Sequence, residues 1–309
     1  MPTRRNVITG VGAGAFVATL GWPVFAAGPC APCVRVVLLG TKGGPTPSPC
    51  RAAPATLIEI GGRAFVVDCG NGVANQLAKA HVPLPRLARI FVTHNHSDHI
   101  ADVGTLIELA WSSGLNKPVT VHGPPPIGAI VRDQLAALAY DVAARVREEG
   151  RTPLAPLVHI DERAAPGVVL RENDVVVTAA LVDHQTVAPA FACRFDTPGR
   201  SIVISGDTHY SDNLVALAKG ADLLIHEAIY APAIDQMGGE NTATLQNHLR
   251  RSHTTTEDVG LVAARAGVKK LVLSHLVPAD PTITDDMWLA GVRRHFAGEA
   301  VVGRDLMQV

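Results

Sequence analysis

Four ligand-type side chains lie within six positions of one short segment: His94, His96, Asp98 and His99. The segment directly follows residues 89–92, an apolar run of the kind that forms buried strands. Alternate side chains of an extended chain point the same way, and a turn can bring the next two ligands back to the same place. Imidazole and carboxylate suit zinc, manganese or iron better than calcium. The chain must therefore fold so that a strand delivers this segment to a metal site.

Short β-rich runs alternate with helical patterns along the chain, which is typical of layered α/β folds. Strands are predicted at 34–39, 56–60, 64–67, 89–92, 119–122, 175–181, 191–195, 201–205, 223–226 and 270–274. Helices are predicted at 73–80, at 101–111, from Pro126 to about Glu149, and from the capping box Thr254-x-x-Glu257 to Ala266. Residues 150–170, with three prolines and mixed charges, are predicted to form a surface excursion. The spread of these patterns favours one domain over residues 34–309.

The N-terminal segment has the layout of a secretory signal. Arg4 and Arg5 precede a Gly- and Ala-rich apolar run that ends near Ala27. The adjacent arginines and the weakly hydrophobic run resemble a twin-arginine export signal. We therefore expect residues 1–27 to be removed and the mature protein to be periplasmic, without stable membrane association. The alternative is an uncleaved anchor, since the run is close to the length of a membrane span.

The charge balance limits which substrates and partners are expected, and the cysteine count limits which disulfides are possible. The 309-residue chain has a net charge of -1, which provides no general attraction to nucleic acid phosphates. Together with export, this predicts a small-molecule ester substrate and no nucleic acid partner. All five cysteines follow the expected cleavage point, and their odd number leaves at least one unpaired. No function is assigned to any of them.

The 94–99 segment resembles the HxHxDH motif of the metallo-β-lactamase superfamily. Its further elements follow in family order: Asp68 in a DxG element, then His184, Asp207 and His275. The resemblance implies a single-domain four-layer αβ/βα sandwich that binds two divalent metal ions, zinc first, with manganese or iron as alternatives. It assigns His94, His96 and His184 to one metal, Asp98, His99 and His275 to the other, and Asp207 to the bridge, with Asp68 in support. Two such ions share a hydroxide that attacks the substrate without a protein nucleophile.

Two further elements resemble the ribonuclease Z and arylsulfatase branch. They are His226-Glu227-Ala228 and Ser252-His253-Thr254-Thr255, whereas the text after His184 lacks the GHTPGS-like loop of glyoxalases, lactonases and many lactamases. In that branch the glutamate orients the histidine, which protonates the leaving oxygen. The predicted catalytic residues are therefore Asp98, Glu227 and His253.

The expected function is hydrolysis of phosphodiesters or aryl sulfate esters, and a homodimer is usual for the branch. The enzymatic alternative is a lactone, carboxyl-ester or β-lactam hydrolase on the same fold. A non-catalytic metal-binding scaffold is the alternative from another class. The histidines outside the family pattern are expected to be structural or superficial: His81, His122, His159, His209, His248 and His295.

Overall fold

The first half of the chain builds one seven-stranded sheet. Its strands are β1 (Val34–Gly40), β2 (Ala55–Ile60), β3 (Arg63–Val67), β4 (Leu87–Phe91), β5 (Val119–Gly123), β6 (Val158–Glu162) and, from the C-terminus, β14 (Met307–Gln308). In this computed structural model, which describes residues 34–309, the order is β14-β1-β2-β3-β4-β5-β6. Pairing is antiparallel as far as β3 and parallel from β3 to β6. The parallel part places the end of β4 inside the sheet.

The second half repeats this plan. Its strands are β7 (Gly167–Glu172), β8 (Val175–Val182), β9 (Ala190–Thr197), β10 (Arg200–Ile204), β11 (Leu223–Ile229), β12 (Lys270–Val277) and β13 (Glu299–Val302). They lie in the order β13-β12-β11-β10-β9-β8-β7. Pairing is antiparallel from β7 to β10 and parallel from β10 to β13. Both sheets therefore have a parallel part whose strand ends can carry functional residues.

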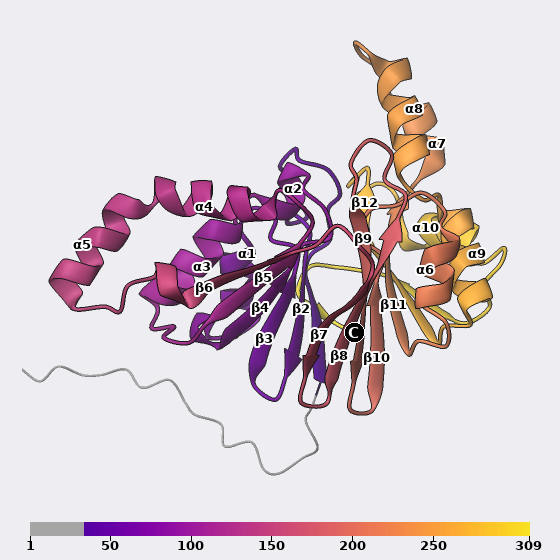
Figure 1. Cartoon of the computed structure of the whole chain (residues 1–309). Helices are drawn as coiled ribbons and strands as arrows, with labels where there is room; N and C mark the ends of the chain where they lie inside the picture. Colours follow the sequence, from indigo (N-terminus) through magenta and orange to yellow (C-terminus); the bar gives the residue numbers. More distant parts are fainter. Residues whose placement is uncertain (1–33) are drawn as a thin grey trace, which may run out of the picture. The chain divides into compact units, whose positions relative to one another are not determined.

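Helices cover the outer face of each sheet (Figure 1). The first half contributes α1 (Val73–Lys79), α2 (Ser97–Ile100), α3 (Val103–Ser112), α4 (Ile127–Ala137) and α5 (Ala139–Glu149), with 3-10 turns at Leu84–Arg86 and Ala155–Leu157. The second half contributes α6 (Asp212–Leu217), α7 (Ala231–Asp235), α8 (Thr242–Ser252), α9 (Thr256–Ala266) and α10 (Asp285–Val292). Among residues 34–309, no helix combines the length and apolar content needed to cross a membrane.

Three apolar layers join these four layers of secondary structure. Phe65, Phe91 and Phe195 lie in the layer between the two sheets, where the Phe91 and Phe195 rings meet edge to face. Separate clusters join each sheet to its own helices, with Trp111 fully buried in the first and Trp288 in the second. Burial of apolar area is the main favourable term in folding. The predicted four-layer αβ/βα sandwich in a single domain is confirmed.

Some local predictions need correction. The long helix after Pro126 is divided at Leu138 into α4 and α5. The predicted surface excursion contains β6, which pairs with β5 at the edge of the first sheet, and the start of β7, which pairs with β8 at the edge of the second. Helix α9 is capped by the Thr255 side chain, one residue later than predicted, since the Thr254 hydroxyl donates to the Thr208 carbonyl instead. The predicted signal segment, residues 1–27, lies outside the described residues.

Candidate metal centre

Ligand-type side chains from both halves meet where strands of the two sheets end. Strand β4 leads into the 94–99 segment, and β8 ends two residues before His184. In the second sheet β10 leads to Asp207, while His275 lies within β12. The loops after β4 and β10 meet there, since ligand atoms of His94 and Asp207 lie within 4.8 Å of each other.

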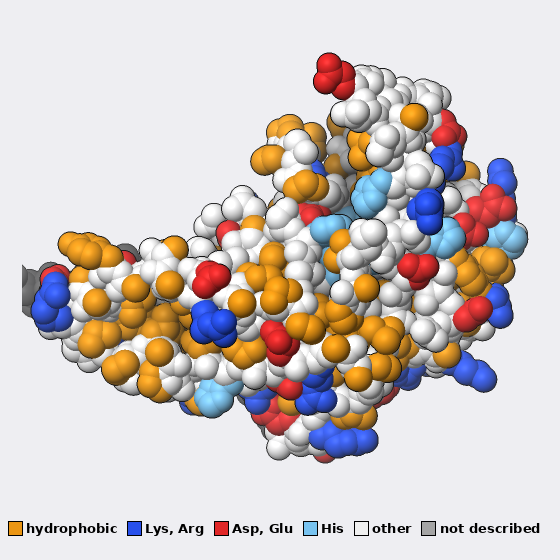
Figure 2. Space-filling view, turned by 45° about the horizontal axis from the view of Figure 1, so that its top comes forward, with side chains coloured by type: hydrophobic (Ala, Val, Ile, Leu, Met, Phe, Trp, Pro, Cys, Tyr) orange, Lys and Arg blue, Asp and Glu red, His pale blue; other side chains and the backbone are white. Residues whose placement is uncertain are grey.

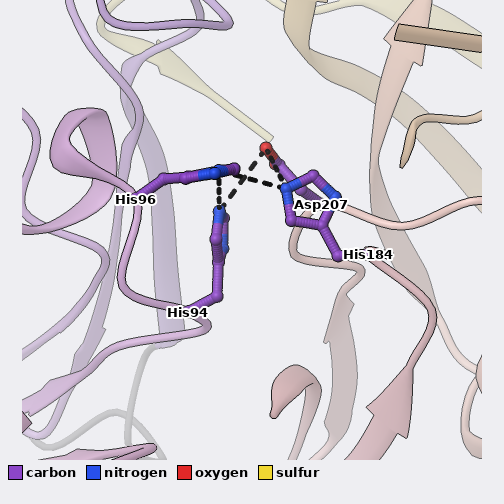
Figure 3. A group of neighbouring side chains, drawn as sticks. All are labelled: His94, His96, His184 and Asp207. Atoms are coloured by element: carbon purple, nitrogen blue, oxygen red, sulfur yellow. Dashed lines mark hydrogen bonds and ion pairs between the residues drawn. The ribbon is translucent and has the colours of Figure 1, made fainter. Parts of the chain in front are cut away.

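The first group is a set of three imidazoles with one carboxylate. Ligand atoms of His94, His96, His184 and Asp207 all lie within 4.8 Å of one another. The Nδ1 atom of His96 is 3.1 Å from the Nε2 atoms of both His94 and His184 (Figure 3). Burial lowers the pKa of His94 well below its usual value and that of His184 to about 4. Neutral rings offer lone pairs, so three converging nitrogens form a ready tripod for a metal ion.

The second group shares the same aspartate. The Nε2 atom of His275 lies 3.4 Å from Asp98 Oδ2 and 3.2 Å from Asp207 Oδ2, and His99 Nε2 lies 3.4 Å from Asp207 Oδ2. The same Asp207 oxygen is 3.7 Å from His94 Nε2 in the first group. One carboxylate oxygen therefore faces both groups, which is the position of a bridging ligand.

Hydrogen bonds on the far side of two rings fix their orientation. His99 Nδ1 donates to Asp68 Oδ2 at 2.8 Å, and His184 Nδ1 donates to the Ser252 carbonyl at 2.8 Å. Asp68 in turn accepts from the Thr93 amide at 2.8 Å. Each ring is thereby left with its Nε2 lone pair directed to the centre, as is usual for metal-binding histidines. This places Asp68 in the supporting role that the family resemblance implies.

His275 reaches the centre through an irregularity in the sheet. The register of β11 and β12 shifts between Glu227 and Ala228, so His275 is the extra residue of a bulge and has a φ of 44°. A Cβ atom on Gly43 would lie 2.7 Å from His275 Nδ1, so this side of the ring is packed against a glycine backbone. A bulge re-aims a side chain out of the strand pattern. No sequence signal indicated either the bulge or the role of Gly43.

The donor set fits divalent metal ions. The Nε2 atoms of His99 and His275 are buried and have no hydrogen-bond partner within residues 34–309. Buried polar atoms are nearly always satisfied, and these two face carboxylate oxygens and other ring nitrogens. Imidazole and carboxylate donors are those that zinc, manganese and iron accept.

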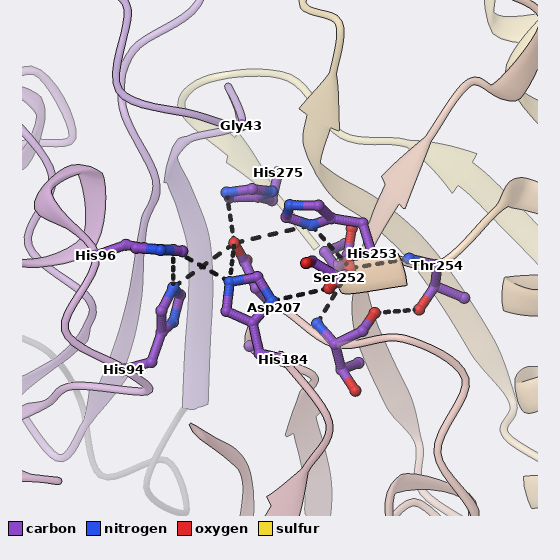
Figure 4. Close-up of polar contacts among 12 residues, drawn as sticks. Gly43, His94, His96, His184, Asp207, Ser252, His253, Thr254 and His275 are labelled. Carbon is purple, nitrogen blue, oxygen red and sulfur yellow. Dashed lines mark hydrogen bonds and ion pairs between the residues drawn. The ribbon is translucent and has the colours of Figure 1, made fainter. Parts of the chain in front are cut away.

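A second buried network adjoins the centre (Figure 4). Glu227 Oε1 accepts from His253 Nδ1 at 3.2 Å and from the Thr208 and Thr254 amides at 3.1 and 3.0 Å. Burial opposes protonation of His253, but the Glu227 carboxylate outweighs it and raises the pKa of His253 to about 9. His253 Nδ1 lies 3.9 Å from Asp207 Oδ2, so the imidazole borders the metal ligands. The backbone donors to Glu227 had no recognisable sequence signal.

Other side chains flagged by the sequence stay outside this centre. The His209 amide donates to the Asp183 carbonyl, and His122 pairs with Asp161 at 2.9 Å beside β5. Cys69 and Cys193 are buried free thiols, and burial raises the pKa of Cys193 to about 12. Cys50 is exposed and forms no disulfide with another cysteine of residues 34–309.

Comparison with known proteins places this fold and site in a family. A model described as "Beta-lactamase superfamily domain" matches residues 63–276. A ribonuclease Z of Mycobacterium bovis is 33% identical over 279 residues, which cover 89% of this chain and 98% of the relative. A ribonuclease Z of Mycobacterium avium is 35% identical over the same coverage.

These relatives correct one expectation. Ribonucleases act on RNA, so the prediction of a small-molecule substrate with no nucleic acid partner is wrong. That prediction depended on the expected export and on the net charge of -1, which averages over the whole surface. A metal centre concentrates positive charge locally and can attract phosphate irrespective of that average.

Solved structures agree on the fold. Human tRNase Z, short form, superposes with a TM-score of 0.64 at 23% identity, covering 89% of this chain and 98% of that one. The metallo-β-lactamase fold protein YhfI from Bacillus subtilis superposes with a TM-score of 0.65 at 21% identity, with the same coverage. With its matching fold, clustered ligands and ribonuclease Z relatives, the chain belongs to the metallo-β-lactamase superfamily of hydrolases.

Proposed function

We propose that this chain is a metal-dependent phosphodiesterase that acts on RNA. The observation that carries the proposal is the His253–Glu227 pair, held 3.9 Å from Asp207 beside the clustered ligands. The mycobacterial relatives, similar over almost their whole length, carry the name ribonuclease Z. Their name favours phosphodiesters over the aryl sulfate esters that the sequence left open.

We assign the metal ligands as the family resemblance implies. One ion would be held by His94, His96 and His184, the other by Asp98, His99 and His275, with Asp207 between them. Zinc is the expected metal, with manganese or iron as alternatives. When bound, such ions supply Lewis-acid charge and lower the pKa of water.

The side chains of this chain then divide the remaining work. Glu227 holds the Nδ1 proton of His253, so the Nε2 atom of His253 is the one available to a substrate. A ribose 3' oxygen is a poor leaving group and needs a proton as its bond to phosphorus breaks. We propose that His253 supplies this proton and that Glu227 orients it. Asp98 would act as a ligand of the second ion. Burial alone would raise the pKa of its carboxyl, but the contact with His275 outweighs burial and lowers that pKa.

A substrate panel on metal-reconstituted protein tests this function. The panel contains an RNA with a 3' extension, bis(p-nitrophenyl) phosphate, an aryl sulfate, a lactone and a cephalosporin. We expect cleavage of the RNA and of the phosphodiester. Turnover of the sulfate, the lactone or the cephalosporin without any phosphodiester cleavage would contradict the proposal.

We propose separately that residues 1–27 direct export to the periplasm and that 34–309 form the hydrolase domain. Arg4 and Arg5 before the Gly- and Ala-rich run support this. The test is translocation of the full chain carrying Arg4→Lys and Arg5→Lys. Unchanged translocation would rule out the twin-arginine route.

A further inference from the structure

Lys42 is the one lysine or arginine that is buried within residues 34–309, with 7% of its surface exposed. Its Nζ atom donates to the Gly43 carbonyl at 2.9 Å and to the Gly44 carbonyl at 2.6 Å. Both partners are neutral, and no carboxylate of the described part of the chain forms an ion pair with it. Burying a charge without a counterion is unfavourable, so a structural role alone is a poor reason for this ammonium.

Lys42 lies next to the metal centre. The backbone of Lys42 forms an isolated parallel β-bridge with Leu276, which is one residue beyond His275. The Gly43 amide donates to the Leu276 carbonyl at 3.1 Å. Figure 4 shows Gly43 above the His275 ring, consistent with the tight approach of its Cα to that ring. The carboxylate of Asp98 also acts on the Lys42 ammonium, although burial outweighs it and lowers the pKa of Lys42. The Lys42 backbone therefore lies beside the strand of His275, and its ammonium is held at the carbonyl of Gly43, the residue that packs against the His275 ring.

The segment that carries Lys42 is fixed at both ends. Asp305 accepts from the Thr41 amide at 3.0 Å and from the Thr41 hydroxyl at 2.7 Å. The Lys42 amide donates to the Ala52 carbonyl at 3.0 Å, and the Ala52 amide donates back to Asp305. The ammonium is thus held in position before any ligand arrives, which reduces the entropic cost of using it.

Metal binding makes the position of Lys42 still less favourable. Divalent ions held by Asp98 and His275 would repel the ammonium and engage the Asp98 carboxylate, so an anionic ligand would be the favourable counterion for Lys42. An ammonium has three donors, and only two are used by carbonyls here. We propose that Lys42 binds an anionic oxygen of the substrate and makes the site selective for anionic esters over neutral ones. This inference rests on the proposed function for the identity of the anion, a phosphodiester.

The test compares two Lys42 variants that separate charge from hydrogen bonding. Lys42→Gln can still donate to the carbonyls of the segment, whereas Lys42→Met cannot. The matched control is Lys79→Met, because Lys79 is exposed and also donates to a neutral oxygen, Gln76 Oε1, at 3.0 Å. Binding of inorganic phosphate to metal-reconstituted protein is measured by calorimetry, with metal content and melting temperature measured on the same samples.

We expect both Lys42 variants to keep their metal and to melt no lower than the parent, because a buried uncompensated charge has been removed. Phosphate binding should weaken roughly 10- to 100-fold in both, as for loss of a charged hydrogen bond. It should stay unchanged in Lys79→Met. Phosphate binding by Lys42→Gln equal to that of the parent would overturn the proposal, as would a parent that binds no phosphate. A lower melting temperature for Lys42→Met but not for Lys42→Gln would reassign Lys42 as a brace of its segment.

Kinetics separate this inference from the proposed function. Lys42→Gln should raise KM for bis(p-nitrophenyl) phosphate at least about ten-fold, whereas the control Lys79→Met should leave it unchanged. If the parent cleaves no phosphodiester but binds phosphate through Lys42, the proposed function fails and the anion site stands. If the parent cleaves RNA and Lys42→Gln behaves like it, the anion site fails and the function stands.

Discussion

The two halves of the fold supply the metal centre in different ways. The first half contributes His94, His96, Asp98 and His99 from one continuous segment after β4. The second half contributes His184 after β8, Asp207 after β10 and His275 from within β12, where it enters through a bulge. A continuous segment is oriented by its own strand and turn, whereas the separate residues depend on the packing of a whole sheet. The first half of the site can therefore be recognised from local spacing, whereas the second-half ligands were predicted only from the family resemblance.

The largest expected effect falls on the residue that joins the two halves. Asp207→Ala removes the one oxygen that faces both ligand groups, so the protein should lose metal and almost all activity. The loss should exceed the roughly 10- to 100-fold that follows removal of a supporting residue. Elemental analysis after reconstitution measures it. Unchanged metal content in Asp207→Ala would mean that the two halves bind metal independently.

Loss of His253 should have a large effect on chemistry but none on metal binding. His253→Ala is expected to keep its metal and to slow RNA cleavage by roughly 100- to 10,000-fold, as for loss of a general acid. Esters with a p-nitrophenolate leaving group need less help and should lose less. Glu227→Gln should act in the same direction but more weakly, because it only orients His253. Equal losses for all leaving groups, or metal loss in His253→Ala, would show that His253 is structural or a ligand.

Removing the residue that supports the first-half ligands should have a smaller effect than the changes above, and the effect should be confined to metal affinity. Asp68→Asn leaves the shape intact but weakens the acceptor for His99 Nδ1 and for the Thr93 amide. We expect metal affinity to fall roughly 10- to 100-fold. The matched control is Asp183→Asn, an exposed aspartate whose side chain accepts only from Gln185 within residues 34–309. Competition with a chelator gives the affinities, and equal values for Asp68→Asn and the parent would exclude this support.

The smallest effect is expected where the second half depends on backbone packing. Gly43→Ala would press a methyl group against His275 and Val277, moving the ring without changing any ligand. We expect about ten-fold weaker metal binding, with little effect on the His94 group. Titration with cobalt, followed by visible absorption, separates the two groups. Equal weakening of both groups would show that the position of His275 is coupled to the His94 group.

The sequence was informative where chemistry and local geometry coincide. The 94–99 cluster was identified from residue type and spacing, and Asp68 and the Glu227–His253 pair were identified from the family resemblance. The bulge at His275, the Ser252 carbonyl behind His184 and the segment holding Lys42 were not, because backbone contacts between distant strands leave no residue pattern. The break between α4 and α5 at Leu138 was missed for a similar reason, since its residues all favour a helix.

The most direct test is the position of the metal ions in crystals of zinc-reconstituted protein, located by anomalous scattering. We expect two sites, one among His94, His96 and His184 and the other among Asp98, His99 and His275, with Asp207 contacting both ions. A centre with these two sites would confirm that both halves of the fold build it together. No anomalous signal among these residues, or ions bound by the 94–99 segment without Asp207 and His275, would contradict it.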